Sequence, residues 1–64
     1  MPQGTIKDFD LQTGRGTLVD DKHRELAFDT QVFLDSGLEE LRLGQRVRFR
    51  ADDDMVTELQ IVSL

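Results

Sequence analysis

The strongest constraint on the fold of this chain is a strict two-residue alternation over residues 45–51, QRVRFRA. Apolar and basic side chains take alternate positions there: Val47, Phe49 and Ala51 against Arg46, Arg48 and Arg50. Successive side chains of a β-strand point to opposite faces, so this pattern predicts a strand with an apolar inner face and a basic outer face. The shorter segment 25–29, ELAFD, predicts a second such strand, with Leu26 and Phe28 inward and Glu25, Ala27 and Asp29 outward.

Three further strands are predicted at residues 4–10, 14–20 and 55–62. The first and the last of these break strict alternation, because Ile6 and Phe9 have opposite parity, as do Leu59 and Val62. A β-bulge or a coiled strand in a closing barrel produces such a break. The expected core consists of the apolar positions of all five strands: Ile6, Leu18, Leu26, Phe28, Val47, Phe49 and Ile61.

The segments between the strands differ in length. Three of them, LQTG, DDKHR and ADDD, are polar and short enough for hairpins, whereas residues 30–44 form a long connection. Leu34, Leu38 and Leu41 follow the spacing of one helix face, which predicts a short helix in that connection, interrupted by Gly37. Three sequential strands, a long crossing and a final hairpin predict an all-β fold, a five-stranded antiparallel Greek-key barrel of OB type. The alternative is a small open antiparallel sheet of SH3-like kind.

Charge and cysteine content limit the cellular compartment and the binding partners that we expect. The chain has no cysteine, so neither disulfides nor thiolate metal sites are available, which suits a reducing cytoplasm. Apolar runs of three residues or fewer are too short to cross a membrane. The net charge of −5 opposes loose attachment to nucleic acid or anionic membranes, yet permits a local basic patch. We expect one monomeric, cytoplasmic domain over residues 1–64 without membrane contact.

Three segments resemble the cold-shock domain family. GTIKDFD at residues 4–10 is similar to the family's opening G-x-V-K-W-F-N/D, and TGRGTLV at 13–19 to its K-G-F-G-F-I. GLEELRLGQRVRF at 37–49 matches G-x-x-x-L-x-x-G-Q-x-V-x-F most closely, and ELAFD lies where the family has D-V-F-V-H. The resemblance implies an OB barrel that binds single-stranded DNA or RNA on aromatic side chains of its first three strands.

The chain departs from the family on those aromatic side chains. By the resemblance, Asp8 stands at the family's tryptophan, Arg15, Thr17 and Ala27 at phenylalanines, and Asp29 at the histidine. Thr13 stands where lysine is frequent, and Leu38 where many members have another phenylalanine. The last hairpin, often basic in the family, reads Asp52-Asp53-Asp54. Base stacking is worth about 1–3 kcal/mol per base, so most of the implied affinity is missing.

Two functions therefore stay open. The first is weak single-stranded nucleic-acid binding through the residues that could contact bases or phosphates: Lys7, Phe9, Arg15, Arg46, Arg48 and Arg50. The second is a protein-interaction or regulatory module on an OB scaffold. Arg15 and the arginines of residues 46–50 have a competing interpretation as solvated charges balanced by nearby acids.

Catalysis, metal binding and a cofactor are not expected. His23 lies in a polar hairpin with no neighbouring histidine, cysteine or serine that could form a nucleophilic relay. Acids at two-residue spacing, such as Asp8 and Asp10, lack the ligand-dense loop that calcium prefers. Gly14 and Gly16 do not precede a helical pattern, which argues against a phosphate-binding loop and favours close strand packing.

Overall fold

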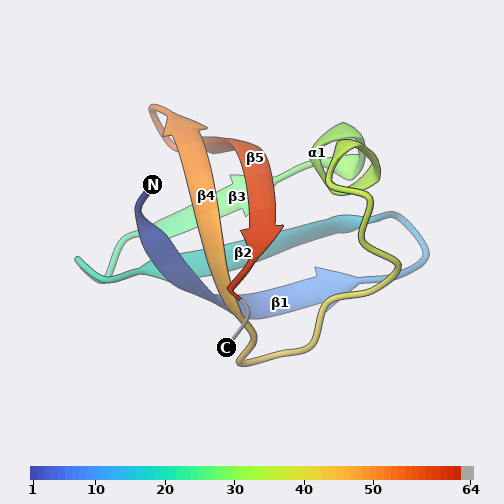
Figure 1. The fold of residues 1–64 in the computed structure, drawn as a ribbon, viewed down its shortest axis with the longest axis horizontal. Helices are drawn as coiled ribbons and strands as arrows, with labels where there is room; N and C mark the ends of the chain where they lie inside the picture. Colours follow the sequence, from blue (N-terminus) through green and yellow to red (C-terminus); the bar gives the residue numbers. More distant parts are fainter. Residues whose placement is uncertain (63–64) are drawn as a thin grey trace.

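The computed structural model describes residues 1–62, in which five strands close into a barrel and one short helix covers one end of it (Figure 1). The elements follow in the order β1 (Gln3–Asp10), β2 (Arg15–Asp20), β3 (Glu25–Phe28), α1 (Thr30–Asp35), β4 (Arg46–Asp52) and β5 (Met55–Ile61). The all-β class and the five predicted strand segments are thus confirmed to within a few residues. In Figure 1, β4 and β5 cross in front of β2 and β3.

Hydrogen bonding joins the strands in the closed order β1-β2-β3-β5-β4. Four pairs are antiparallel, and the β3–β5 pair is parallel, at Ala27 opposite Met55. The expectation of a wholly antiparallel sheet is wrong at this pair, because an odd number of strands cannot alternate in direction around a closed ring. Closure also excludes the open-sheet alternative.

An extra residue in β1 shifts its register against β2. Ile6 pairs with Leu18, but Asp8 pairs with Thr17, so Lys7 is the bulged residue. The bulge places Ile6 inside the barrel at 2% exposure and turns the Phe9 ring inward while Asp8 stays outside. The parity break between Ile6 and Phe9 is therefore explained as predicted.

A second bulge lies in β5. Arg50 pairs with Glu58 and Ala51 with Val56, which leaves Thr57 as the extra residue. Val56 and Leu59 are both buried as a result. The bulge thus reconciles two inward residues at odd spacing in one strand.

Two residues predicted to face the core are exposed. Ala51 lies beyond the point where β4 leaves β1, since their last backbone hydrogen bond joins the Phe49 N–H to the Pro2 carbonyl. Ile61 lies at the other end of the barrel and is 36% exposed. The alternation predicted the correct face of the strand for both residues, but at the ends of the barrel no neighbouring strand covers that face.

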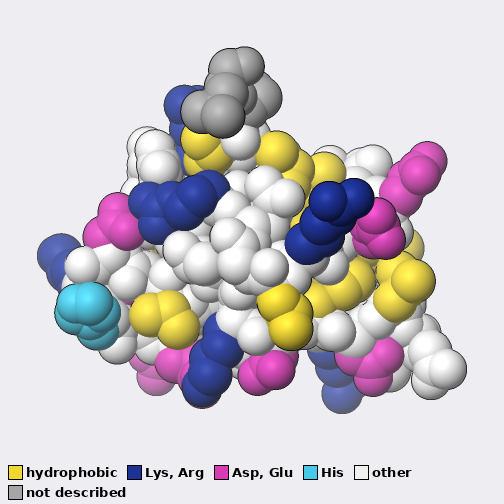
Figure 2. All heavy atoms as spheres, turned by 90° about the horizontal axis from the view of Figure 1, so that it is seen from below, with side chains coloured by type: hydrophobic (Ala, Val, Ile, Leu, Met, Phe, Trp, Pro, Cys, Tyr) yellow, Lys and Arg dark blue, Asp and Glu magenta, His cyan; other side chains and the backbone are white. Residues whose placement is uncertain are grey.

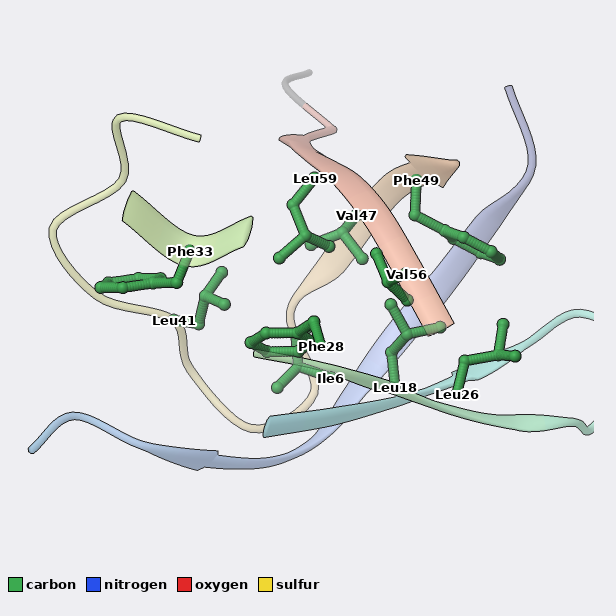
Figure 3. Close-up of a cluster of buried hydrophobic side chains, with 10 residues drawn as sticks. All are labelled: Ile6, Leu18, Leu26, Phe28, Phe33, Leu41, Val47, Phe49, Val56 and Leu59. Atoms are coloured by element: carbon green, nitrogen blue, oxygen red, sulfur yellow. The ribbon is translucent and has the colours of Figure 1, made fainter. Parts of the chain in front are cut away.

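The core fills the barrel and extends under α1 (Figure 3). Its buried members come from every element and from the loop before β4: Ile6, Leu18, Leu26, Phe28, Phe33, Leu41, Val47, Phe49, Val56 and Leu59. Phe33 in α1 and Leu41 in the loop close the end of the barrel where Phe28 lies, as the close-up shows. Most of the expected core is confirmed, and Phe33 is the large residue that strand patterns could not reveal.

Truncation inside the barrel should cost far more than truncation on its surface. Phe49 is 2% exposed, so Phe49→Ala removes a fully packed ring, and we expect a loss of about 3–5 kcal/mol in the free energy of unfolding. Leu34→Ala serves as the matched control, because Leu34 is 62% exposed and its loss should stay within about 0.5 kcal/mol. Urea denaturation measures both. Equal losses would contradict the inward assignment of Phe49.

Helix α1 begins at an aspartate cap. Asp29 lies just after β3, and its carboxylate accepts a hydrogen bond from the backbone N–H of Val32 at 3.1 Å. Asp29 was expected on the outer face of the third strand, and this expectation is wrong. The N–H groups of the first helical turn have no partner within the helix, and the Asp29 carboxylate accepts from one of them as the N-cap. The helix of residues 1–62 is too short to cross a membrane.

The three leucines predicted to share one helix face do not all lie in the helix. Leu34 points outward from α1, and the helix ends before Gly37, whose φ of 75° is the left-handed conformation that glycine tolerates best. Leu38 and Leu41 pack on the core from the loop that follows. A short helix exists in the long connection as expected, but one turn earlier, where Phe33 supplies its single buried contact.

Asp20 organises the β2–β3 turn. Its side chain is 4% exposed; Oδ1 accepts from the backbone N–H groups of Lys22 and Arg24, and Oδ2 from the Arg24 guanidinium at 2.8 Å. The backbone N–H of Arg24 contributes most, and together these donors outweigh burial and lower the pKa of Asp20. The carboxylate therefore stabilises the fold in its charged form.

The Asp20 interactions should make stability pH-dependent. Because the folded-state pKa is lowered, the stabilisation is present above the ordinary aspartate pKa of about 3.9 and is lost as pH falls from there through the folded-state pKa. Asp20→Asn keeps an oxygen for the two N–H groups but removes the charge, so its melting temperature should fall less steeply over that acidic range than that of the wild type. Melting temperatures that fall equally with pH in the two proteins would contradict this assignment.

Candidate nucleic-acid interface

The outer face of β1, β2 and β3 carries small and charged side chains. Asp8 pairs with Thr17, and Thr17 with Ala27, so these three side chains form one row across the sheet. Asp10 and Arg15 form the next pair outward along β1 and β2. This face presents no aromatic ring at any of these positions, so it lacks the platforms on which bases stack.

Phe9 is the one predicted aromatic contact on this side, and the structure places it largely inward. Its ring centre lies 4.9 Å from that of Phe33 and 6.3 Å from that of Phe28, at interplanar angles of 50° and 26°. The ring is partly buried and packs on the core. Only its remaining edge borders a shallow depression of about 450 Å³ between β1, β2 and β3.

Gly16 shapes that depression from β2. A Cβ atom there would lie 2.4 Å from the Asp8 carbonyl oxygen and 2.6 Å from the Phe28 ring, so any side chain would force these groups apart. Glycine at this position lets β1 cross closely over the Phe28 ring. The glycine pair noted in the sequence therefore serves strand packing, and Gly14 adds a left-handed turn with a φ of 75°.

Lys7 and Arg15 differ in how they are held. Lys7 donates to the Glu25 carboxylate of β3 across β2, and this hydrogen bond raises the pKa of Lys7. Both groups are more than half exposed, so the pair is worth little stability. Within residues 1–62 the Arg15 guanidinium has neither an ion pair nor a hydrogen bond, and it is accordingly the more available cation of this face.

The arginine row on β4, made up of Arg46, Arg48 and Arg50, lies on the other side of the barrel from β2 and β3. Its first member, Arg46, already has hydrogen-bond partners. The Arg46 guanidinium donates to Asp21 at 3.1 Å, to Thr5 at 3.2 Å and to Gln3 at 3.1 Å, which clamps β4 across β1 to the β2–β3 turn. These partners use most of the donors that a phosphate would need.

Arg50 and Arg48 are less constrained. Arg50 lies 3.4 Å from a carboxylate oxygen of Glu58, in an exposed pair. Arg48 pairs in register with Gln3 on β1 and with Gln60 on β5, so neutral amides flank it on both sides. In the described part of the chain Arg48 contacts no acid, and it is the centre of the most basic strip of the barrel.

The predicted contact residues therefore fall into two groups on different strands of the barrel, and they do not form one continuous binding surface. Lys7, Phe9 and Arg15 belong to β1 and β2, whereas the arginine row belongs to β4. The underside of the barrel carries basic and acidic side chains next to one another, with no region of one sign (Figure 2). The arginine row is thus the better candidate for phosphate contacts.

Two glutamines beside Arg48 were missed from the sequence. Gln3 and Gln60 lie in strands at opposite ends of the chain, and only the barrel register brings both beside β4. Amide N–H₂ groups donate to phosphate oxygens and so extend the strip without adding charge, although the Gln60 amide already donates one hydrogen bond to Glu58 at 3.3 Å. The outward parity of Gln60 in the predicted strand 55–62 was a usable signal. Gln3 precedes the predicted first strand, and the pairing partner of neither glutamine could be predicted.

Comparison with protein-family models, with curated proteins and with solved structures gives no match to this chain. Among residues 1–62 no three histidine, aspartate or glutamate side chains gather as metal ligands. The geometry of the described residues is therefore the basis on which a function is assigned.

Proposed function

We propose that this chain is an OB-type Greek-key barrel of cold-shock-like kind that binds single-stranded nucleic acid weakly, through phosphates rather than bases. The observation that carries the proposal is Arg48: an exposed guanidinium that has no ion pair among residues 1–62 and is flanked in register by two amide side chains. The resemblance of residues 37–49 to the family's most specific segment supports the fold assignment.

The weakness of binding follows from the two faces together. On β1 to β3, Asp8 and Asp10 repel phosphate and no exposed ring replaces the lost stacking energy. On β4, Arg46 and Arg50 already contact Asp21 and Glu58, so binding phosphate there means giving up an existing ion pair. A few phosphate contacts of this kind are typical of non-specific association.

Binding should be weak, salt-dependent and centred on Arg48. We expect mixed-sequence single-stranded DNA and RNA to bind with a Kd in the range of about 10⁻⁴–10⁻⁶ M at physiological salt. Arg48→Ala should weaken binding several-fold and reduce the slope of log K against log salt by about 0.7, the value for one phosphate contact to a single strand. Fluorescence anisotropy at three salt concentrations measures both quantities.

Arg42→Ala is the matched control, because it removes the same charge from an exposed loop position outside the arginine row. An equal loss in the two variants would show that only net charge matters and would refute a site at Arg48. Sub-micromolar binding by the wild type would refute the claim of weak binding.

Aromatic platforms restored to the β1–β3 face should raise affinity. The variant Asp8→Trp, Arg15→Phe, Thr17→Phe, Ala27→Phe leaves Asp29 in place, because that residue caps α1. At about 1–3 kcal/mol per stacked base, even two productive platforms should tighten oligonucleotide binding by tens-fold or more. Anisotropy measures the change, and circular dichroism confirms that the barrel is retained.

Leucine at the same four positions is the control, since it changes charge equally but offers no flat ring. Stacking predicts that only the aromatic variant gains affinity. An equal gain with leucine would show that removal of the Asp8 charge or added apolar surface, rather than stacking, controls binding at this face.

A further inference from the structure

The Gln3 side chain borders both Arg46 and Arg48 on the outside of the barrel. Gln3 pairs in register with Arg48 across the β1–β4 ladder, so the two side chains leave the same face of the sheet. Arg46 lies two residues before Arg48 on β4 and reaches Gln3 diagonally, with its Nη2 atom 3.1 Å from the Gln3 Oε1 atom. One amide side chain therefore contacts the first arginine of the row and lies beside the second.

The contact with Arg46 determines which end of the Gln3 amide is occupied. A guanidinium carries only donors, so the group that accepts from Arg46 is the Gln3 carbonyl oxygen. Among residues 1–62 the Nε2 amino group of Gln3 donates to no acceptor, whereas its Oε1 atom has this one donor. Two N–H groups of Gln3 are thus free beside Arg48.

The amide on the other side of Arg48 is less available. Gln60 also pairs in register with Arg48, but its Nε2 atom donates to Glu58 at 3.3 Å. Glu58 itself lies 3.4 Å from the Arg50 guanidinium. Gln3 is therefore the neighbour that can offer both of its amide donors to an anion at Arg48.

Asp21 explains why the orientation of the Gln3 amide has to be held. Asp21 and Gln3 line the same depression at the β2–β3 turn, and the Arg46 guanidinium donates to both of them. Without Arg46, the Asp21 carboxylate would be an acceptor without a cation, next to an amide that can donate to it. The Gln3 amino group would then turn to Asp21 and away from Arg48.

We propose that Arg46 is a positioning residue of the phosphate site: it is anchored on Asp21 and holds the Gln3 carbonyl, so that the Gln3 amino group and the Arg48 guanidinium bind one phosphodiester group together. This role rests on the proposed function, because it concerns the same site. A guanidinium is a rigid fork of donors and serves Asp21 and Gln3 at once, which the compact ammonium of lysine does not. A phosphate oxygen accepts from both arginine and amide donors.

A double-mutant cycle tests the coupling between Arg46 and Gln3. Arg46→Lys retains the charge, and Gln3→Met retains the length of the side chain without its amide. Each should weaken binding of the mixed-sequence oligonucleotide by about three- to tenfold, the equivalent of one hydrogen bond. In the Gln3→Met protein, Arg46→Lys should cause no further loss, because no amide remains to be oriented. Fluorescence anisotropy measures all four proteins.

Two outcomes of the cycle would overturn the positioning role. An equal loss from Arg46→Lys with and without the Gln3 amide would show that Arg46 only stabilises the barrel. Full binding by Arg46→Lys would show that its charge, rather than its fork, is what the site uses. Circular dichroism confirms that each variant is folded under the conditions of the titration.

Control variants separate this role from the proposed function. Gln12→Met removes an exposed amide from the β1–β2 turn and should leave binding unchanged, so a loss equal to that of Gln3→Met would overturn the role of Gln3. An unaltered affinity in Arg48→Ala would refute the phosphate site and the positioning role together. A loss in Arg48→Ala without a loss in Gln3→Met would refute the positioning role alone.

Side-chain amide NMR gives a readout that does not depend on affinity. The Gln3 Nε2 signal is assigned by its disappearance in Gln3→Met. Addition of the oligonucleotide to the wild type should shift this signal more than that of Gln12, and in Arg46→Lys, at the same fraction bound, the Gln3 shift should be lost. An unchanged Gln3 signal in the wild type, or the same shift in both proteins, would overturn the assignment.

Discussion

The bulge at Lys7 decides which side chains of β1 meet solvent, and the outer face of β1 to β3 depends on it. Before the bulge, β1 pairs with β2 and β4 and sends Ile6 inward; after it, β1 pairs with β2 alone and sends Phe9 inward and Asp8 outward. Without the extra residue, alternation from Ile6 would place Asp8 in the core and the Phe9 ring in solvent. A buried, unpaired aspartate would be very costly, so the bulge is required by the sequence that surrounds it.

Gly16 matches this bulge from the opposite strand. Where Phe9 turns inward, it meets Phe28 beneath β2, and only a residue without a side chain leaves room for both β1 and the Phe28 ring. The cluster of Phe9, Phe28 and Phe33 then anchors α1 to the barrel. The same packing that stabilises this small core also withdraws the one surviving ring from a base-stacking role.

The sequence predicted strands well because each depends on neighbouring residues: the alternation of residues 45–51 identified β4, Val47 and Phe49 correctly. Features that depend on distant residues were less accessible. Burial of Ala51 and Ile61 failed at the barrel ends, and the cap formed by Asp29 required knowing where β3 stops. The arginines of β4 were identified as candidates, but which of them is free was not predictable, because Asp21 reaches Arg46 across β1.

Net charge describes this protein poorly because acids and bases lie next to one another on its surface. The overall value of −5 suggests an anion that avoids nucleic acid, yet Arg48 on β4 has no ion pair among residues 1–62. Electrostatic screening acts over about 8 Å at physiological ionic strength, so a phosphate at Arg48 meets mainly the charges closest to that residue. At 0.01 M salt the screening length rises to about 30 Å and exceeds the barrel, and the acids then oppose the arginines. The affinity that low salt adds to phosphate contacts is therefore partly cancelled by the acids on the rest of the barrel. The shortfall in affinity relative to a uniformly basic barrel is thus largest at low salt.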